Sequence, residues 1–179
     1  MNIIDKAAKI MLAAHKNQTR KTDGSPYVAH PMMVAKKLAR LDLGDEVVAA
    51  ALLHDVLEDT DFDKKNLQQE VGDKVYQIVL AVSEDKEMEW EDRKQKYIDT
   101  VINSPEEVKF VSIADKIHNL ESLINTHQTM GPAIWEKFNR GKDKKMWFEK
   151  KLLEGFKKTW SHDLVDEYEK LIKKTEELT

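Results

Sequence analysis

The stretch "ALLHDVLEDT" contains, within six consecutive positions, four side chains that can bind a metal or move a proton. They are His54, Asp55, Glu58 and Asp59, and they follow an apolar run, residues 47–53, that is typical of a buried helix. Residues four apart share one face of a helix, so we expect His54 to stack with Glu58 and Asp55 with Asp59. Three carboxylates packed together would repel one another, and a divalent cation removes that conflict. Mixed imidazole and carboxylate ligands suit Mn, Fe, Co or Zn.

Two residues elsewhere in the chain could complete such a site. His30 comes just before Pro31, a residue that favours the first turn of a helix. Asp115 lies in an apolar stripe of a predicted helix, and a carboxylate on a core-facing stripe needs a partner. Together with His54 and Asp55 these residues supply two nitrogens and two oxygens. The set predicts a metal site with positions left open for water and substrate.

Each of these features also has a purely structural interpretation. A second His-Asp pair, His162-Asp163, follows Ser161 at a predicted helix start. A capping serine and an acidic first turn explain that pair without a metal, so a His-Asp pair alone carries little information. Asp115 alone would be explained better as a capping or salt-bridged group, and His30 alone as a helix cap. The combination of all the motifs is more specific than any one of them.

Local basic residues could hold an anionic ligand. Arg20 and Lys21 stand in the loop "QTRKTDGSPY", whose bend Gly24 and Pro26 would fix. Arginine gives forked hydrogen bonds to phosphate and lysine gives a point charge, so beside a metal site this pair favours phosphate binding. A second basic cluster, "RGKDKK" at residues 140–145, is interpreted as a solvated linker.

The elements that position these residues are predicted to be helices throughout. Helical periodicity or helix-start signals mark residues 3–15, 31–41, 45–57, 88–103 and 106–125, two helices on either side of Gly72, and two or three charged helices after residue 125. No stretch alternates as a strand would. We therefore expect an all-α fold in one domain, residues 1–179, with a motif-bearing core at about 1–125 and a helical extension at about 126–179.

Composition narrows the classes of function. The chain of 179 residues has no cysteine, which removes disulfides, cysteine-ligated zinc and thiol nucleophiles. Its formal net charge of −4 provides no general attraction to nucleic acid. No apolar run approaches the ~20 residues of a membrane span, and the start lacks a signal-peptide core. We expect a cytoplasmic protein that binds neither nucleic acid nor membranes; the sequence predicts no oligomeric state.

The motifs "RKTDGSPYVAHP", "ALLHDVLEDT" and "IADKIHNL" resemble, in order and spacing, the hydrolase domain of the RelA/SpoT family within the HD superfamily. The stand-alone small alarmone hydrolases are the most similar type. This resemblance implies an all-helical HD fold, one Mn²⁺ ion and a small nucleotide substrate. It implies removal of the 3′-pyrophosphate from (p)ppGpp, which gives GDP or GTP and pyrophosphate.

The same resemblance assigns roles by motif position. The implied metal ligands are His30, His54, Asp55 and Asp115. The implied catalytic pair is Glu58 and Asp59. The implied substrate contacts are Arg20 and Lys21 to phosphate, Asn119 near the ribose, and Ser122, where the family often has a small hydroxyl residue. An aromatic segment that packs on the base matches residues 147–149.

Three alternatives stay open at this point. Another HD phosphohydrolase, 5′-nucleotidase-like on dNMPs or an NADPH phosphatase, would share the metal ligands; a 5′-nucleotidase would not need Arg20 and Lys21. A non-catalytic nucleotide-binding or regulatory protein could keep the fold, although the intact Glu58 and Asp59 argue against it. A purely structural helical protein would carry no stoichiometric metal.

Overall fold

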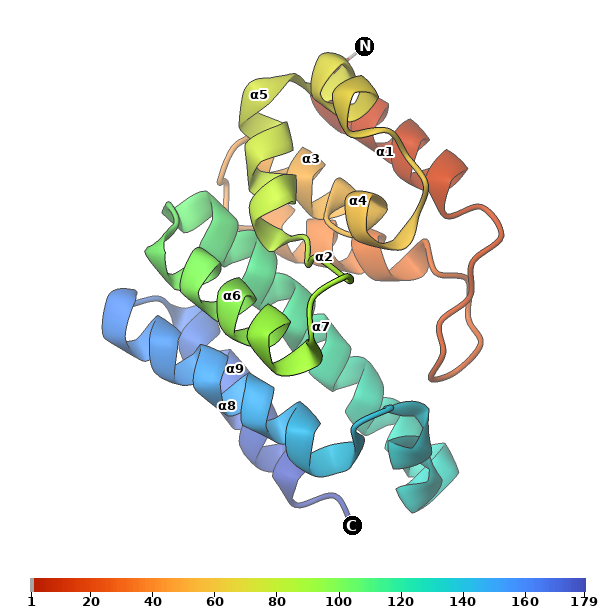
Figure 1. Cartoon of the computed structure of the whole chain (residues 1–179), viewed down its shortest axis with the longest axis vertical. Coiled ribbons are helices and arrows are strands. Elements are labelled where there is room, and N and C mark those ends of the chain that lie inside the picture. The colour runs from red at the N-terminus through yellow and green to blue at the C-terminus, as the bar shows by residue number, and fades with distance from the viewer. Residues whose placement is uncertain (1) are drawn as a thin grey trace.

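Residues 2–179 are described by a computed structural model, and within that range the chain forms helices and no strand (Figure 1). The α-helices are α1 (Ile3–Ala14), α2 (Ala29–Ala39), α3 (Asp45–Leu53), α4 (Val56–Asp59), α5 (Lys64–Val82), α6 (Trp90–Asn103), α7 (Glu106–Met130), α8 (Gly141–Thr159) and α9 (Asp163–Glu176), and η1 (Gly131–Lys137) is a 3-10 helix. The predicted all-α fold is confirmed. None of these helices is long and apolar enough to cross a membrane.

Helix α3 is the centre of the N-terminal half. Every residue from Val47 to Leu53 is buried, because α3 packs against α1, α2 and α5 together (Figure 1). A helix covered on all sides has no polar face, which explains why the sequence shows an unbroken apolar run there. The end of α3 is therefore held rigidly in the interior, and the residues that follow it start from a fixed position.

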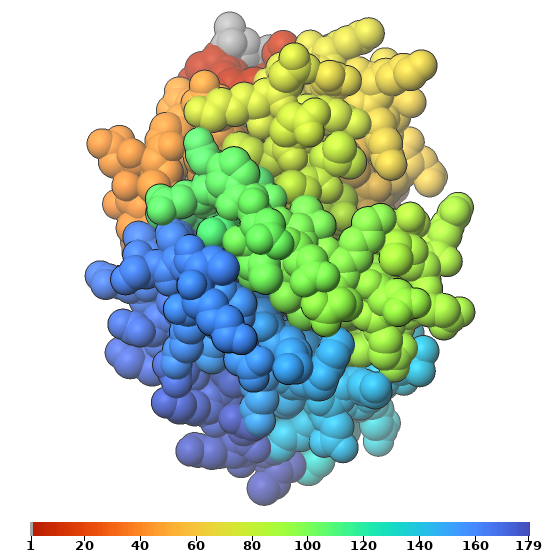
Figure 2. Space-filling model, turned by 60° about the vertical axis from the view of Figure 1, so that its left-hand side comes forward, coloured from red at the N-terminus to blue at the C-terminus, as the bar shows by residue number. Residues whose placement is uncertain are grey.

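Helix α7 joins the two halves of the molecule. It packs against α2, α3 and α5 and also against α9 and η1. Helix α8 packs on α6 and on α9. At the α6–α8 contact Gly155 lies so close to Ile102 that an added Cβ would stand 2.5 Å from its Cγ2. In the space-filling view the C-terminal helices, in blue, lie directly against the green middle of the chain (Figure 2).

Three local predictions meet different outcomes. The break at Gly72 is confirmed, since its φ of 79° interrupts α5. The prediction of one helix over residues 45–57 is wrong: α3 ends at Leu53, and a turn at His54 and Asp55 precedes the short helix α4. Ser161 does not cap α9; the ring of His162 does, accepting a hydrogen bond from the Leu164 N–H over 3.1 Å.

Candidate metal and nucleotide site

The four predicted metal ligands converge from three packed segments. His30 lies in the first turn of α2, His54 and Asp55 form the turn between α3 and α4, and Asp115 lies midway along α7. His30, His54 and Asp115 are buried, and each places one donor atom within 4.8 Å of the other two. The turn after Leu53 points His54 toward α2, whereas a continuous helix would have stacked it on Glu58.

The distances between donor atoms are those of a metal site. The Nε2 atoms of His30 and His54 are 3.2 Å apart. Asp115 Oδ1 is 3.0 Å from His30 Nε2, and Asp55 Oδ2 is 3.0 Å from His54 Nε2; the two cross distances are both 3.6 Å. A cation about 2.1 Å from each ligand atom holds neighbouring ligand atoms about 3.0 Å apart at a right angle and about 3.4 Å apart at the tetrahedral angle.

The outer nitrogens of both imidazoles are engaged elsewhere. His54 Nδ1 lies 2.8 Å from the carbonyl oxygen of Ala51 and donates to it, which leaves Nε2 with a free lone pair. His30 Nδ1 lies 2.7 Å from Nδ1 of His118. If His30 donates its Nδ1 proton to His118, two bare Nε2 lone pairs face each other. Such outer contacts fix the tautomer and orientation of metal-binding histidines.

The site also favours a positive charge at its centre. Burial opposes protonation of His54, yet the neighbouring carboxylates of Asp55 and Asp115 hold its pKa well above the usual value. A divalent cation would supply that positive charge in place of a proton. The donor set, its spacing and its charge therefore fit a divalent metal ion.

The two acidic residues after the ligands stand in different surroundings. Burial, together with the charge of Glu84, raises the pKa of Glu58 to about 7. Glu58 Oε2 accepts a hydrogen bond from the backbone N–H of Glu84 over 3.0 Å. Asp59 instead accepts from Lys86 Nζ over 2.5 Å and from the hydroxyl of Tyr27 over 3.0 Å. The pair thus combines a carboxyl that retains a proton near neutral pH with a carboxylate held by a cation.

Tyr27 links this acidic pair to the ligands. Its hydroxyl also lies 2.6 Å from Asp55 Oδ2, the oxygen that faces His54. Sequence reasoning missed both Tyr27 and His118. Each was quoted within a motif, but a tyrosine in a loop and a histidine three residues after Asp115 carry no signal of their own before the helices are packed.

The basic loop reaches the site through one amide side chain. A bridge between Thr19 and Pro26 closes the loop, and Arg20 Nη2 donates to Asn119 Oδ1 over 3.0 Å. Asn119 Nδ2 donates to Asp115 Oδ1 over 2.5 Å. Within residues 2–179, Arg20 Nε is buried and has no hydrogen-bond partner. Arg20 and Asp59 line a separate cavity of about 470 Å³.

A cavity of about 520 Å³ is lined by three of the predicted metal ligands, His30, Asp55 and Asp115. Its lining includes Lys21 and Asn119 but not Ser122, which stands two turns after Asp115 on α7. Phe148 of the predicted aromatic segment also lines it. The interpretation of residues 140–145 as a solvated linker is wrong, because this stretch begins α8 and three of its residues line the cavity: Arg140, Gly141 and Lys145.

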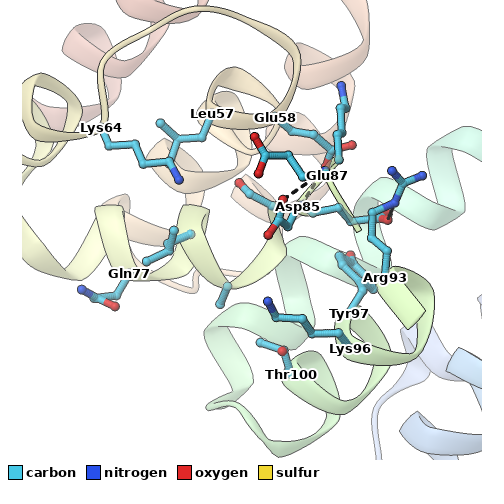
Figure 3. Close-up of a pocket in the computed structure, with 15 residues that line it drawn as sticks. Leu57, Glu58, Lys64, Gln77, Asp85, Glu87, Arg93, Lys96, Tyr97 and Thr100 are labelled. Atoms are coloured by element: carbon cyan, nitrogen blue, oxygen red, sulfur yellow. Dashed lines mark hydrogen bonds and ion pairs between the residues drawn. The ribbon is translucent and has the colours of Figure 1, made fainter. Parts of the chain in front are cut away.

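A second cavity, of about 730 Å³, adjoins the first and shares Glu58, Glu84 and Arg93 with it. Figure 3 shows Glu58 on one side of this space and Tyr97 and Thr100 of α6 on the other. Glu58 therefore stands in the wall between two cavities, and it can be reached from either.

Comparisons with known proteins show which family and fold this chain shares. Residues 7–139 match the HD domain family. The chain is 38% identical over 112 residues to the zebrafish (Danio rerio) guanosine-3′,5′-bis(diphosphate) 3′-pyrophosphohydrolase MESH1, covering 61% of this chain and 62% of that protein. It is 37% identical over 120 residues to the Mus musculus MESH1, covering 65% and 67%. It is 35% identical over 116 residues to the Haemophilus influenzae guanosine-3′,5′-bis(diphosphate) 3′-pyrophosphohydrolase, covering 62% of this chain but only 17% of that relative.

Two solved structures share the fold. A metazoan ortholog of SpoT that hydrolyses ppGpp superposes with a TM-score of 0.78 at 24% identity, covering 97% of this chain and 96% of that one. The protein lmo0812 of Listeria monocytogenes superposes with a TM-score of 0.74 at 33% identity, covering 80% and 96%. The chain spans less than two thirds of the Haemophilus influenzae and zebrafish relatives.

Proposed function

The chain belongs to the HD domain family, and from that membership and the geometry of the site we propose that it is a metal-dependent phosphohydrolase that removes the 3′-pyrophosphate of (p)ppGpp. The products are GDP or GTP and pyrophosphate. The observation that carries the proposal is the pair of facing Nε2 atoms, 3.2 Å apart, with Asp55 and Asp115 beside them. Relatives named as 3′-pyrophosphohydrolases of this nucleotide support it.

We assign the metal to His30, His54, Asp55 and Asp115, and we propose that it is Mn²⁺, the ion that the family resemblance implies; the mixed nitrogen and oxygen ligands are compatible with it. When bound, such a cation supplies Lewis-acid polarisation of the phosphoryl group and favours the ionisation of water. Asn119 and Lys116 both hold the Asp115 carboxylate in place. These contacts orient the Asp115 carboxylate.

We assign a different proton transfer to each of the two acidic residues, Glu58 and Asp59. We assign Glu58 as the general acid, since a carboxyl with a pKa of about 7 still carries a proton near neutral pH. Asp59, held by Lys86 and Tyr27, is the acceptor. As water attacks phosphorus, its proton passes to Asp59; as the bond from phosphorus to the 3′-oxygen breaks, Glu58 protonates that oxygen.

The basic loop is assigned to the phosphoryl oxygens. Arg20 and Lys21 offset the negative charge of the substrate and the charge that grows in the transition state. Asn119, already bonded to Arg20, is assigned to the ribose, and Ser122 remains a proposed contact although it lies outside the lining of the cavity. Phe148 is assigned to the base.

The charges in the lining of the 520 Å³ cavity help to choose between (p)ppGpp and a nucleoside monophosphate as substrate. Its lining contains seven lysine and arginine side chains: Lys21, Arg93, Lys94, Lys116, Lys137, Arg140 and Lys145. So many cations favour a substrate with several phosphates over a nucleoside monophosphate. We further propose that the protein is cytoplasmic and that residues 1–179 act as one domain. The one-domain proposal is supported by buried side chains from every α-helix, α1 to α9, which contribute to one hydrophobic core.

A product assay tests this function. Purified protein with Mn²⁺ is incubated with ppGpp, pppGpp, NADPH, dNMPs and cyclic dinucleotides, and products are separated by ion-exchange chromatography. We expect GDP and pyrophosphate in equal amounts from ppGpp, and no activity from His54→Ala. Turnover of a dNMP without turnover of ppGpp would replace the proposal with a 5′-nucleotidase.

A further inference from the structure

Three lysines from three helices meet in the wall of the 520 Å³ cavity. Lys94 of α6, Lys116 of α7 and Lys145 of α8 all line it, and their side chains are only 17%, 12% and 19% exposed. We call these three residues the lysine cluster. Buried ammonium groups are costly unless they are paired, so their convergence needs an explanation.

Each ammonium group is anchored by one carboxylate. Lys94 pairs with Glu84, Lys145 with Glu149, and Lys116 Nζ lies 2.7 Å from Asp115 Oδ2. The aromatic ring of Phe148 lies between two of them, with its centroid 4.6 Å from Lys94 Nζ and 5.6 Å from Lys116 Nζ. An ammonium group has three donors, and one carboxylate does not use all of them.

The ammonium groups are also crowded. Burial, with the neighbouring charges of Lys116 and Lys145, holds the pKa of Lys94 below its usual value despite the opposing charge of Glu84. Arg93 Nε lies 3.0 Å from the same Glu84 carboxylate, so two cations share one anion there. An anion entering the cavity would relieve the mutual repulsion of these cations.

The carboxylate of Asp115 contacts both the lysine cluster and the predicted metal ligands. Asp115 Oδ2 lies 2.7 Å from Lys116 Nζ, and Asp115 Oδ1 lies 3.0 Å from His30 Nε2. An anion that reaches both sides of Asp115 needs two linked charged groups. A single phosphate has one, whereas a diphosphate has two.

We propose that the lysine cluster binds the terminal phosphate of the 3′-pyrophosphoryl group and retains the pyrophosphate product after cleavage. This inference rests on the proposed function for its substrate. It assigns Lys94, Lys116 and Lys145 a role in binding that differs from that of Arg20 and Lys21.

The test measures the affinity of inorganic pyrophosphate for the protein with its metal retained, by equilibrium dialysis without added divalent cation. Lys94→Met is the variant of choice, because Glu84 keeps Arg93 as its partner and no buried acid is left unpaired. We expect its Kd for pyrophosphate to rise about 10- to 100-fold, the effect of one lost charge-assisted hydrogen bond. Lys94→Arg should recover most of that affinity, and orthophosphate binding should change less.

Lys144→Met is the matched control. Lys144 neighbours Lys145 on α8 and also lies over Trp90, but it is 47% exposed and pairs with Glu91. Its Kd should equal that of the wild type. If the folded Lys94→Met protein binds pyrophosphate as tightly as the wild type, or if the wild type binds none, the inference is overturned.

The two proposals fail in different ways. If ppGpp is hydrolysed while pyrophosphate affinity does not depend on Lys94, the proposed function stands and the lysine cluster has a structural role only. If pyrophosphate affinity depends on Lys94 while ppGpp is not hydrolysed, the lysine cluster stands as a pyrophosphate site and the function fails.

Discussion

Replacing Glu84 by glutamine should move the pH profile of the reaction. Glu84 raises the pKa of Glu58 by charge repulsion, second only to burial, and its own charge is held by Arg93 and Lys94. Glu84→Gln keeps the backbone N–H that binds Glu58 but removes the repulsion, and it frees two nearby cations. A neighbouring charge shifts a carboxyl pKa by about 1 to 3 units, so we expect a fall of about 1 to 2 units for Glu58.

The direction of the shift in the pH profile follows from the proposed role of Glu58 as proton donor. Activity falls as pH rises through its pKa, about 7 in the wild type. A lower pKa in the variant starts that fall at lower pH, so kcat should decline between pH 5 and 7 where the wild type is still active. The other charged groups near Glu58 are Asp55, Asp59 and Lys86, and the substitution leaves all three in place.

The assay is kcat for ppGpp from pH 4.5 to 9 with the metal content measured at each pH. Glu87→Gln is the control, because Glu87 lines the second cavity on the same connecting segment (Figure 3). Its profile should match the wild type. A descending limb that stays in place in Glu84→Gln, or that moves to higher pH, would refute the assignment of Glu58 as the acid controlled by Glu84.

Four further outcomes are expected. His54→Ala should lose the stoichiometric metal in elemental analysis, whereas His162→Ala, which removes a helix cap and aromatic contacts outside the predicted ligand set, should retain it; full metal content in the first variant would exclude His54 as a ligand. Asp59→Asn should keep the metal and lose about 10²- to 10⁴-fold in kcat, and a near-normal rate would make this carboxylate structural. Arg20→Ala should lower kcat/KM for ppGpp about 10- to 100-fold, with a smaller effect on any dNMP. Gly155→Ala should destabilise the protein by about 1–3 kcal/mol in urea denaturation, because its Cβ would collide with a packed side chain, and unchanged stability would mean that α8 can shift freely.

Much of the fold could be predicted because helical signals are local. The stripe in residues 3–15, the break at Gly72 and the start after Pro105 each depend on neighbouring residues only. The turn at His54 and Asp55 could not be predicted in this way. Both residues are compatible with a helix, and no local signal marks the turn that brings them beside His30 of α2 and Asp115 of α7.

Part of the candidate site could be predicted from the sequence, and part could not. Its predicted ligands stand out because a carboxylate or imidazole beside buried residues is unusual wherever it occurs. The lysine cluster does not stand out, since nothing in the sequence separates Lys94, Lys116 and Lys145 from exposed lysines such as Lys96 and Lys144. Only the packing of α6, α7 and α8 around Phe148 separates these three from the lysines that face solvent.

Tyr27 has one hydroxyl proton and two carboxylate acceptors, Asp55 and Asp59. A proton donated to one acceptor is withheld from the other, so whatever changes the electron density on Asp55 also changes the basicity of Asp59. If Asp55 binds the proposed cation, cation affinity at Asp55 and proton affinity at Asp59 are thermodynamically linked, and such a linkage is reciprocal. On the proposed assignments, a change in the charge of either carboxylate would therefore be felt at the other through Tyr27.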